Sequence, residues 1–249
     1  MKKVVIILVL FFGFRAVYSQ SMIDSAITIP YIGISYGFHG PQGDLKDRFG
    51  TISTIGGQFG LKLKSNIYMA FKMDYAFGNK VKEEGMLDNI RTSEGGIIEV
   101  GGQLTDPILD MQGYTIALMG GYLMPFLKAN PNSGFLVSIG PSFFQHKIEI
   151  DYRDAQISQL EGDYEKGYDR LTSGFGLNEF IGYIYFSRRK LINFYAGFEF
   201  MQTWSKSKRG FNYDTMESDD KTRKDNLAGF RFGWVLTLYR RAPEQYYYR

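Results

Sequence analysis

The chain has 249 residues, of which 44% are hydrophobic and 16% aromatic, enough apolar surface for a folded core. It contains no cysteine, which excludes disulfides, thiolate metal sites and cysteine nucleophiles, and its two histidines argue against a histidine-based catalytic or zinc centre. The net charge of +3 comes from Lys2, Lys3 and Arg15, since the first nineteen residues hold no acid and +3 − 3 leaves 0. A neutral mature chain argues against nucleic-acid binding.

Residues 1–19 are typical of a secretory signal peptide. Two lysines precede an apolar run from Val4 to Phe14, and Val17 and Ser19 occupy the −3 and −1 positions of a cleavage site. The run is too short for a permanent membrane helix, which needs roughly 20 residues. We therefore expect a barrel domain over 20–241 and a short periplasmic tail over 242–249. An exported chain with no later apolar segment of 18 residues is either soluble or a β-barrel.

Alternation with a period of two dominates the mature chain. In 66–78, every odd position from Ile67 to Phe77 is large and apolar, whereas the even positions hold Lys72, Asp74 and small residues. Such a pattern indicates a strand with one apolar face. Eight segments are predicted to be strands: 28–39, 51–63, 66–78, 113–124, 135–146, 173–186, 192–204 and 227–239. Segment 173–186 alternates less cleanly, so parity does not assign its faces, and Glu179 is expected to lie in the lumen.

The apolar face is rich in Phe and Tyr, and the opposite face carries Gly, Ser, Thr and isolated charges, which is typical of a barrel facing lipid. Three short connections at 64–66, 126–133 and 187–190 alternate with longer ones at 40–50, 79–112, 147–172 and 205–226. The segment 96–104 is predicted to be a hairpin inside the second of these. The predicted fold is an all-β, eight-stranded antiparallel up-and-down transmembrane β-barrel with three long outer loops besides the shorter connection at 40–50. The alternative is a soluble secreted antiparallel barrel or sandwich.

The inward-facing rows bring charged residues into the lumen. Three positive and three negative side chains are expected there: Lys62, Lys72, Asp74, Glu179, Glu199 and Arg231. Charges in a confined lumen need partners, so we expect a salt-bridged plug. The alternative is a narrow polar path.

The outer connections combine charged and aromatic residues, which are common anchors of protein contacts. The contact candidates are Asp44, Asp47, Arg48, Tyr164, Tyr168, Arg209 and Tyr213. No spacing typical of a calcium loop occurs, so no metal site is predicted. A set of His146, Ser142 and Glu149 could be drawn for a hydrolase, but a chain with this many serines and acids offers such sets by chance.

The chain resembles the small outer-membrane β-barrel proteins of Bacteroidota-type envelopes over nearly all of its mature length. The resemblance rests on the Ser19–Gln20 cleavage style and on three segments: YIGISYGFHGPQGDLKDRFG at 31–50, LEGDYEKGYDRLTSGF at 160–175 and LINFYAGFEFMQTWSKSKRGFNYDT at 191–215. It implies a barrel in the outer membrane and supplies no catalytic residues. The polar tail after the last strand departs from the terminal aromatic of many outer-membrane proteins.

We therefore expect a non-enzymatic integral outer-membrane barrel, without a cofactor, that acts as a structural or accessory scaffold for an envelope complex. Its expected partners are outer-membrane lipid and envelope proteins, and the sequence does not define its oligomeric state. The alternatives are a narrow channel and an outer-membrane hydrolase acting on lipid or peptide.

Overall fold

The computed structural model describes residues 26–238, apart from 125, 128, 153–154 and 188–191. The predicted signal peptide and the predicted tail lie outside these residues. None of the helices in the described part is long and apolar enough to cross a membrane.

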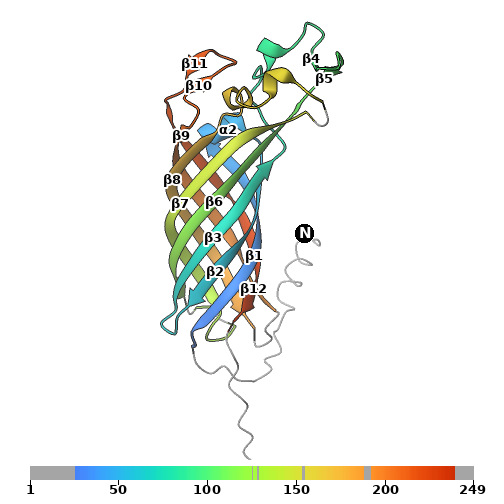
Figure 1. The fold of residues 1–249 in the computed structure, drawn as a ribbon. Coiled ribbons are helices and arrows are strands. Elements are labelled where there is room, and N and C mark those ends of the chain that lie inside the picture. Colours follow the sequence, from blue (N-terminus) through green and yellow to red (C-terminus); the bar gives the residue numbers. More distant parts are fainter. Residues whose placement is uncertain (1–25, 125, 128, 153–154, 188–191, 239–249) are drawn as a thin grey trace, which may run out of the picture.

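Eight long strands form a closed barrel in which each strand pairs antiparallel with its neighbours and the last strand returns to the first (Figure 1). The predicted eight-stranded up-and-down barrel is confirmed. The strands are β1 (Ile29–Gly43), β2 (Ile52–Lys62), β3 (Ile67–Gly78), β6 (Ile108–Met124), β7 (Gly134–Asp151), β8 (Thr172–Phe186), β9 (Asn193–Ser207) and β12 (Thr222–Thr237). Several run about five residues further into the long connections than the alternation predicts. The hydrogen-bonded ladder continues there although its outer face is no longer apolar.

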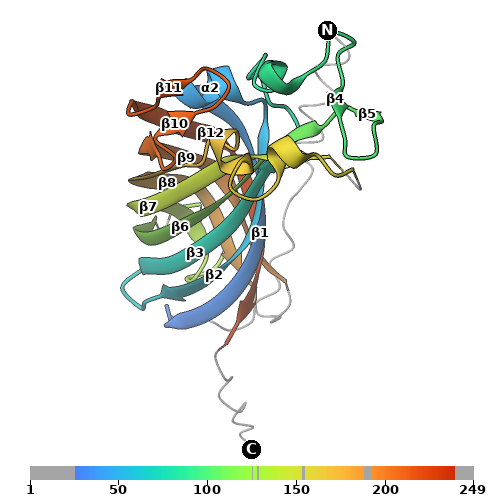
Figure 2. The same cartoon turned by 45° about the horizontal axis from the view of Figure 1, so that its top comes forward.

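The long connections gather at one end of the barrel, here called the loop end, and the start of β1 and the end of β12 lie at the other, the turn end (Figures 1 and 2). The small elements of the loop end are α2 (Asp44–Arg48), η1 (Asp88–Ile90), β4 (Ile97–Ile98), β5 (Leu104–Thr105), η2 (Ser158–Leu160), η3 (Glu165–Gly167), β10 (Phe211–Asn212) and β11 (Glu217–Ser218). β4 and β5 pair antiparallel, which confirms the hairpin expected within 96–104. The segment 40–50 is less of a loop than expected, because β1 continues to Gly43 and α2 follows at once.

The strands are strongly tilted. The pairing followed once around the barrel from Gly33 returns to β1 at Gly43, a stagger of 43 − 33 = 10 residues. For eight strands this stagger corresponds to a tilt of about 40°. Each residue then adds about 2.5 Å of height, so a strand of 15 residues is long enough to span a bilayer's apolar layer.

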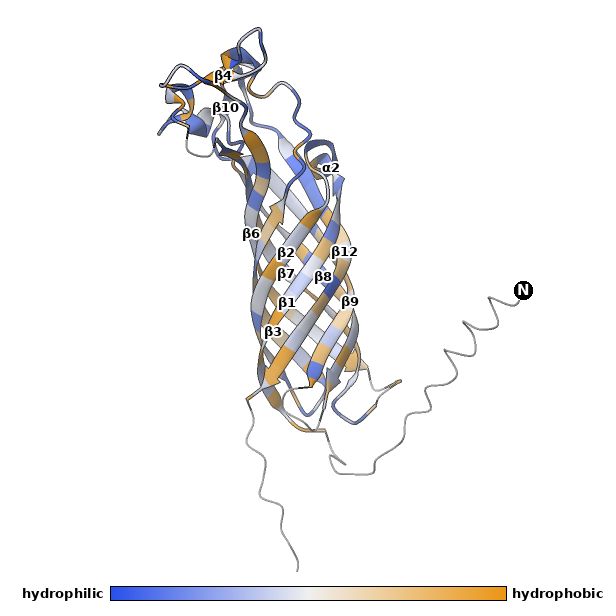
Figure 3. Ribbon diagram, turned by 90° about the vertical axis from the view of Figure 1, so that its right-hand side faces the viewer, coloured by the Kyte–Doolittle hydropathy of each residue, from blue (hydrophilic) through white to orange (hydrophobic). Residues whose placement is uncertain are grey.

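The two faces of the wall differ as the alternation predicts. Large apolar side chains point outward on every strand, such as Phe71 on β3, Phe198 on β9, which is 67% exposed, and Phe232 on β12. Hydrophilic residues gather in the loops (Figure 3). This distribution reverses that of a soluble barrel, in which large apolar residues fill the interior.

β8 corrects one expectation from the sequence. Asn178 and Phe180 point into the barrel, and Glu179 lies on the outward row between exposed Leu177 and Ile181. The predicted placement of Glu179 in the lumen is therefore wrong. Large aromatic rings fit inside because glycines face them: a Cβ atom on Gly182 would lie 2.7 Å from the Phe180 ring.

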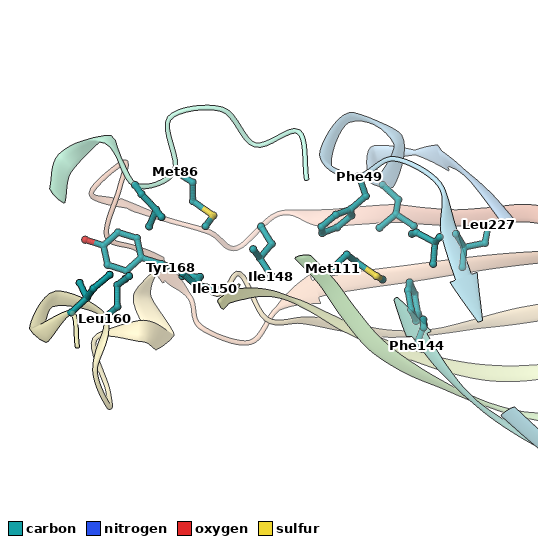
Figure 4. Packing of buried hydrophobic residues seen from close by; sticks show 14 of the residues in the cluster. Phe49, Met86, Met111, Phe144, Ile148, Ile150, Leu160, Tyr168 and Leu227 are labelled. Atoms are coloured by element: carbon teal, nitrogen blue, oxygen red, sulfur yellow. The ribbon is translucent and has the colours of Figure 1, made fainter. Parts of the chain in front are cut away.

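Apolar side chains also bridge the barrel and its loops. Leu227, Phe144 and Met111 fill the upper lumen, and residues including Ile148 and Tyr168 continue the same buried cluster among the loops (Figure 4). The loops at this end are thus anchored on the barrel by a continuous core.

Candidate functional site

A charged cluster fills the middle of the lumen, with Arg231 of β12 at its centre. The guanidinium donates from Nε to Glu199 Oε2 at 2.7 Å and from Nη1 and Nη2 to the two oxygens of Asp74 at 2.9 and 3.0 Å. The hydroxyls of Ser35 and Thr54 accept its remaining hydrogen bonds, at 2.7 and 3.2 Å. All five N–H donors of the guanidinium are therefore satisfied.

Further polar groups surround the two acids. Lys72 pairs with Glu199 and lies 3.6 Å from Asp74, while the side-chain amide of Asn178 donates to Glu199 Oε1 at 3.0 Å. His39 Nε2 lies 2.9 Å from Glu199 Oε2. Because β3 alternates, Lys72 and Asp74 share one face and reach the same cluster.

The cluster contains two cations and two carboxylates, all at most 4% exposed: Lys72, Arg231, Asp74 and Glu199. Four of the six predicted lumen charges therefore meet in one network. Lys62 is buried separately near the turn end, where its ammonium donates to Asn132 Oδ1 at 2.8 Å. Glu179 lies outside the barrel. The ion-pair network contains fewer charges than the predicted plug, and hydroxyls and an amide complete its hydrogen bonds.

The lumen leaves little free space at this level. Beside the cluster lies a cavity of about 20 Å³, lined by residues that include Gln58, Tyr68 and Phe180. That volume suits about one water molecule. Toward the turn end, the Tyr31 hydroxyl donates to the Tyr68 hydroxyl at 2.7 Å, and the ring of Tyr31 occupies space that only a glycine at position 60 leaves open.

A second polar layer lies toward the loop end and bears on the hydrolase alternative. His146 Nε2 lies 3.1 Å from Asp225 Oδ2, and the hydroxyl of Ser205 also donates to Asp225. No hydrogen bond joins the serine to the histidine, and all three side chains are buried. A nucleophile needs contact with its base and with substrate, and these three side chains do not have that arrangement.

The hydrolase set drawn from the sequence is not assembled either. His146 and Ser142 point into the barrel, whereas Glu149 points outward and pairs with Lys147 at 2.5 Å. No group of three or more His, Asp and Glu side chains in the described part of the chain is arranged to hold a metal ion.

At the loop end, ion pairs tie separate connections together. Arg170 contacts Glu83 at 2.8 Å and Asp214 at 2.5 Å, and so joins three loops. Arg209 donates from Nε to Asp169 Oδ1 at 2.9 Å, and this hydrogen bond raises the pKa of the guanidinium above its ordinary value. Sequence reasoning missed Arg170, Glu83 and Asp214, because nothing in their spacing shows that these loops meet.

The same loops form a pocket of about 660 Å³, here called the outer pocket. It is lined by Asn89, Ile90, Ser158, Gln159, Tyr164, Tyr168, Phe211, Tyr213 and Met216. Tyr168 and Tyr213 contact edge to face with ring centroids 5.9 Å apart, and the Asn89 amide donates to the Tyr168 hydroxyl at 2.9 Å. Tyr164 is 63% exposed at the entrance.

The outer pocket unites three of the seven contact candidates, Tyr164, Tyr168 and Tyr213. Asp44 and Asp47 are exposed on α2, where Asp44 accepts a hydrogen bond from the Lys224 backbone at 2.7 Å. Arg48 was expected to be an exposed contact, and this is wrong. It is buried and pairs with Glu83, because α2 turns it toward the barrel mouth.

No family model matches the sequence, and neither does any curated protein. Among solved structures, the chain is similar to Ail, the attachment invasion locus protein of Yersinia pestis, in complex with the heparin analogue sucrose octasulfate. The identity is 9%, the match covers 84% of this chain and 99% of that one, and the TM-score is 0.38. It is also similar to the N-terminal β-barrel domain of Pseudomonas aeruginosa OprF, with 12% identity, 82% and 97% coverage, and a TM-score of 0.35.

Proposed function

We propose that this protein is an integral outer-membrane β-barrel whose lumen is closed and whose outer pocket binds another component of the cell envelope. It acts as an accessory or scaffold protein without catalytic activity. The observation that carries the proposal is the combination of a hydrogen-bonded charge cluster in the lumen with a partly exposed aromatic pocket at the loop end.

The membrane location is supported by the outer wall of the barrel. Apolar side chains cover it on all eight strands, and a closed sheet leaves no unpaired backbone edge to face hydrocarbon. A soluble protein rarely exposes a contiguous apolar surface of this extent. The leader predicted over 1–19 supplies the export route, and a Bacteroidota-type envelope remains a prediction from the resemblance.

The closed lumen favours a scaffold over a channel. Two cations and two carboxylates neutralise one another across the barrel, and the space beside them holds about one water molecule. Ion-selective pores are lined by groups of one charge sign. Purified protein in a planar bilayer should show no steady single-channel steps. Such steps at neutral pH would refute the closed lumen and support the alternative of a narrow channel.

The outer pocket supports the binding role. Its walls come from three connections that Arg170 and the buried loop core hold together, so the pocket exists before a partner arrives. Preformed pockets lose less conformational entropy on binding. Exposed Tyr164 and Met216 at its edge have the size and apolar area of interface anchors.

The test is capture of the partner from intact cells by a mild cross-linker, followed by purification of the barrel. Tyr164→Ala and Met216→Ala remove exposed side chains and leave the buried core untouched, so they should reduce the captured partner at least tenfold. Val100→Ala, which alters an exposed side chain on the connection between β4 and β5, should leave it unchanged. Equal capture by all three variants would refute the outer pocket as the binding surface.

A further inference from the structure

Glu179 places a carboxylate on the outward face at the centre of β8. It lies seven residues from each end of the strand, since 179 − 172 and 186 − 179 both equal 7. At about 2.5 Å of height per residue it is about 17 Å from either end, in the middle of a hydrocarbon layer roughly 30 Å thick. Its ladder partners are Ile139 on β7 and Phe200 on β9.

No other charged side chain of the described strands occupies such a position. The remaining charges on outward rows lie within about four residues of the loop end: Asp110, Lys147, Glu149, Asp151, Lys206 and Lys224. Charges facing lipid at mid-depth are costly and therefore indicate a function. The position of Glu179 is not explained by the charge cluster in the lumen, because its side chain lies on the other side of the wall.

Within its own chain Glu179 is poorly satisfied. The one hydrogen bond it makes among the described residues comes from Gln202 Nε2 at 3.5 Å, the long limit for such a bond. A carboxylate has about four acceptor sites. Most of its acceptor capacity, and one N–H of the Gln202 amide, therefore face outward without a partner in the described chain.

A groove of about 470 Å³ lies beside this pair on the outer wall. Its lining includes Ile139, Ile181, Phe198, Phe200 and Ala228. Glu179 also lines the groove, and Gln202 lies on the outward row of β9 two residues beyond Phe200. The surface is therefore concave and mostly apolar, with the acceptor inside it and the donor next to it, a shape suited to a protein surface packed against it within the membrane.

We propose that this patch of β7, β8 and β9 binds a second copy of the same chain in the membrane. In a two-fold arrangement, the Gln202 amide of each copy donates to the Glu179 carboxylate of the other. The lipid-facing rows of the described strands hold no cation at mid-depth, because Lys147, Lys206 and Lys224 lie within about four residues of the loop end, so an ion pair with Glu179 is not available to a second copy. The donor and the acceptor instead lie side by side, which makes the patch complementary to itself. The inference rests on the membrane location proposed above.

Cysteine cross-linking tests this directly, because the chain contains no cysteine. Ile181→Cys places a thiol on the patch, and Ile55→Cys places one on β2, four strands away on the opposite wall; both positions are about half exposed. In dilute liposomes with copper–phenanthroline as oxidant, Ile181→Cys should form at least tenfold more disulfide-linked dimer. Equal yields from the two positions would overturn the proposal.

Variants in the Ile181→Cys background test the polar pair. Glu179→Leu and Gln202→Leu should each lower the dimer yield about tenfold, because each breaks both symmetric hydrogen bonds. Glu179→Gln, which keeps a hydrogen-bonding side chain of the same size, should retain most of the dimer, and Leu177→Ala controls for lost apolar area. Undiminished cross-linking by Glu179→Leu would refute pairing with a second copy.

Membrane insertion is measured separately, by resistance of the protein to extraction with alkaline carbonate. A chain that is extracted refutes the proposed membrane location. An inserted chain that yields no specific dimer refutes only this inference.

Discussion

Arg231→Met is the substitution that most directly tests the plug. The guanidinium makes five hydrogen bonds, three of them to the carboxylates of Asp74 and Glu199. A methionine side chain is of similar length but uncharged, so two buried carboxylates would be left with Lys72 as their nearest remaining cation. Removing one partner of a buried ion pair costs about 3–5 kcal/mol. We expect the free energy of unfolding to fall by that amount.

A second variant separates charge imbalance from lost packing. Arg231→Met combined with Asp74→Asn leaves one cation, Lys72, and one anion, Glu199, so the lumen is neutral again. The double variant should be about 1–3 kcal/mol more stable than Arg231→Met alone, the range of coupling between residues in one network. Lys224→Met, at the exposed loop end, should change stability by less than about 0.5 kcal/mol.

Urea titration of the barrel in lipid vesicles measures these differences. Trp204 and Trp234 both lie on the outer wall, so their fluorescence changes when the strands leave the lipid. The reasoning is refuted if Arg231→Met unfolds at the same urea concentration as the unmodified protein, or if Asp74→Asn fails to restore any stability.

The other predictions concern packing and depth. Gly60→Ala should lower the free energy of unfolding by about 1–3 kcal/mol in the same titration, because its Cβ would lie 2.1 Å from the Tyr31 ring. Gly57→Ala, on the outer face of the same strand, should be nearly neutral, because the nearest atom to its Cβ would be 3.5 Å away. Equal losses of stability would contradict the packing of the lumen near the turn end. Brominated lipids should quench both Trp204 and Trp234, and full accessibility of either residue to aqueous iodide would contradict the predicted depth of the wall.

The eight strands could be predicted because the outward and inward faces of the wall require opposite chemistries of alternate residues. In 66–78 the alternation is uninterrupted, and β3 occupies nearly the same range. The faces of β8 could not be assigned because both rows contain aromatic residues. Only the pairing with β9, which brings Gly197 opposite Gly182, creates the space that lets Phe180 turn inward.

The candidate site also has features that the sequence predicts and features that only the tertiary structure decides. Parity alone predicts that Lys72, Asp74, Glu199 and Arg231 point inward, but height in the barrel depends on stagger as well as on position along each strand. Lys62 shares the inward row of β2 and still lies too near the turn end to join them. The contacts among the loops depend even more on the tertiary structure, since Arg170 joins connections that are far apart in sequence.

The sequence by itself determined the barrel, its number of strands and, on every strand except β8, which side chains point outward, because these depend on a local period of two. The tertiary structure decided which charges meet, which loops share a pocket and that Glu179 faces outward. Those outcomes depend on the ten-residue stagger and on the fit of large side chains against glycines from other strands, and no local pattern encodes either.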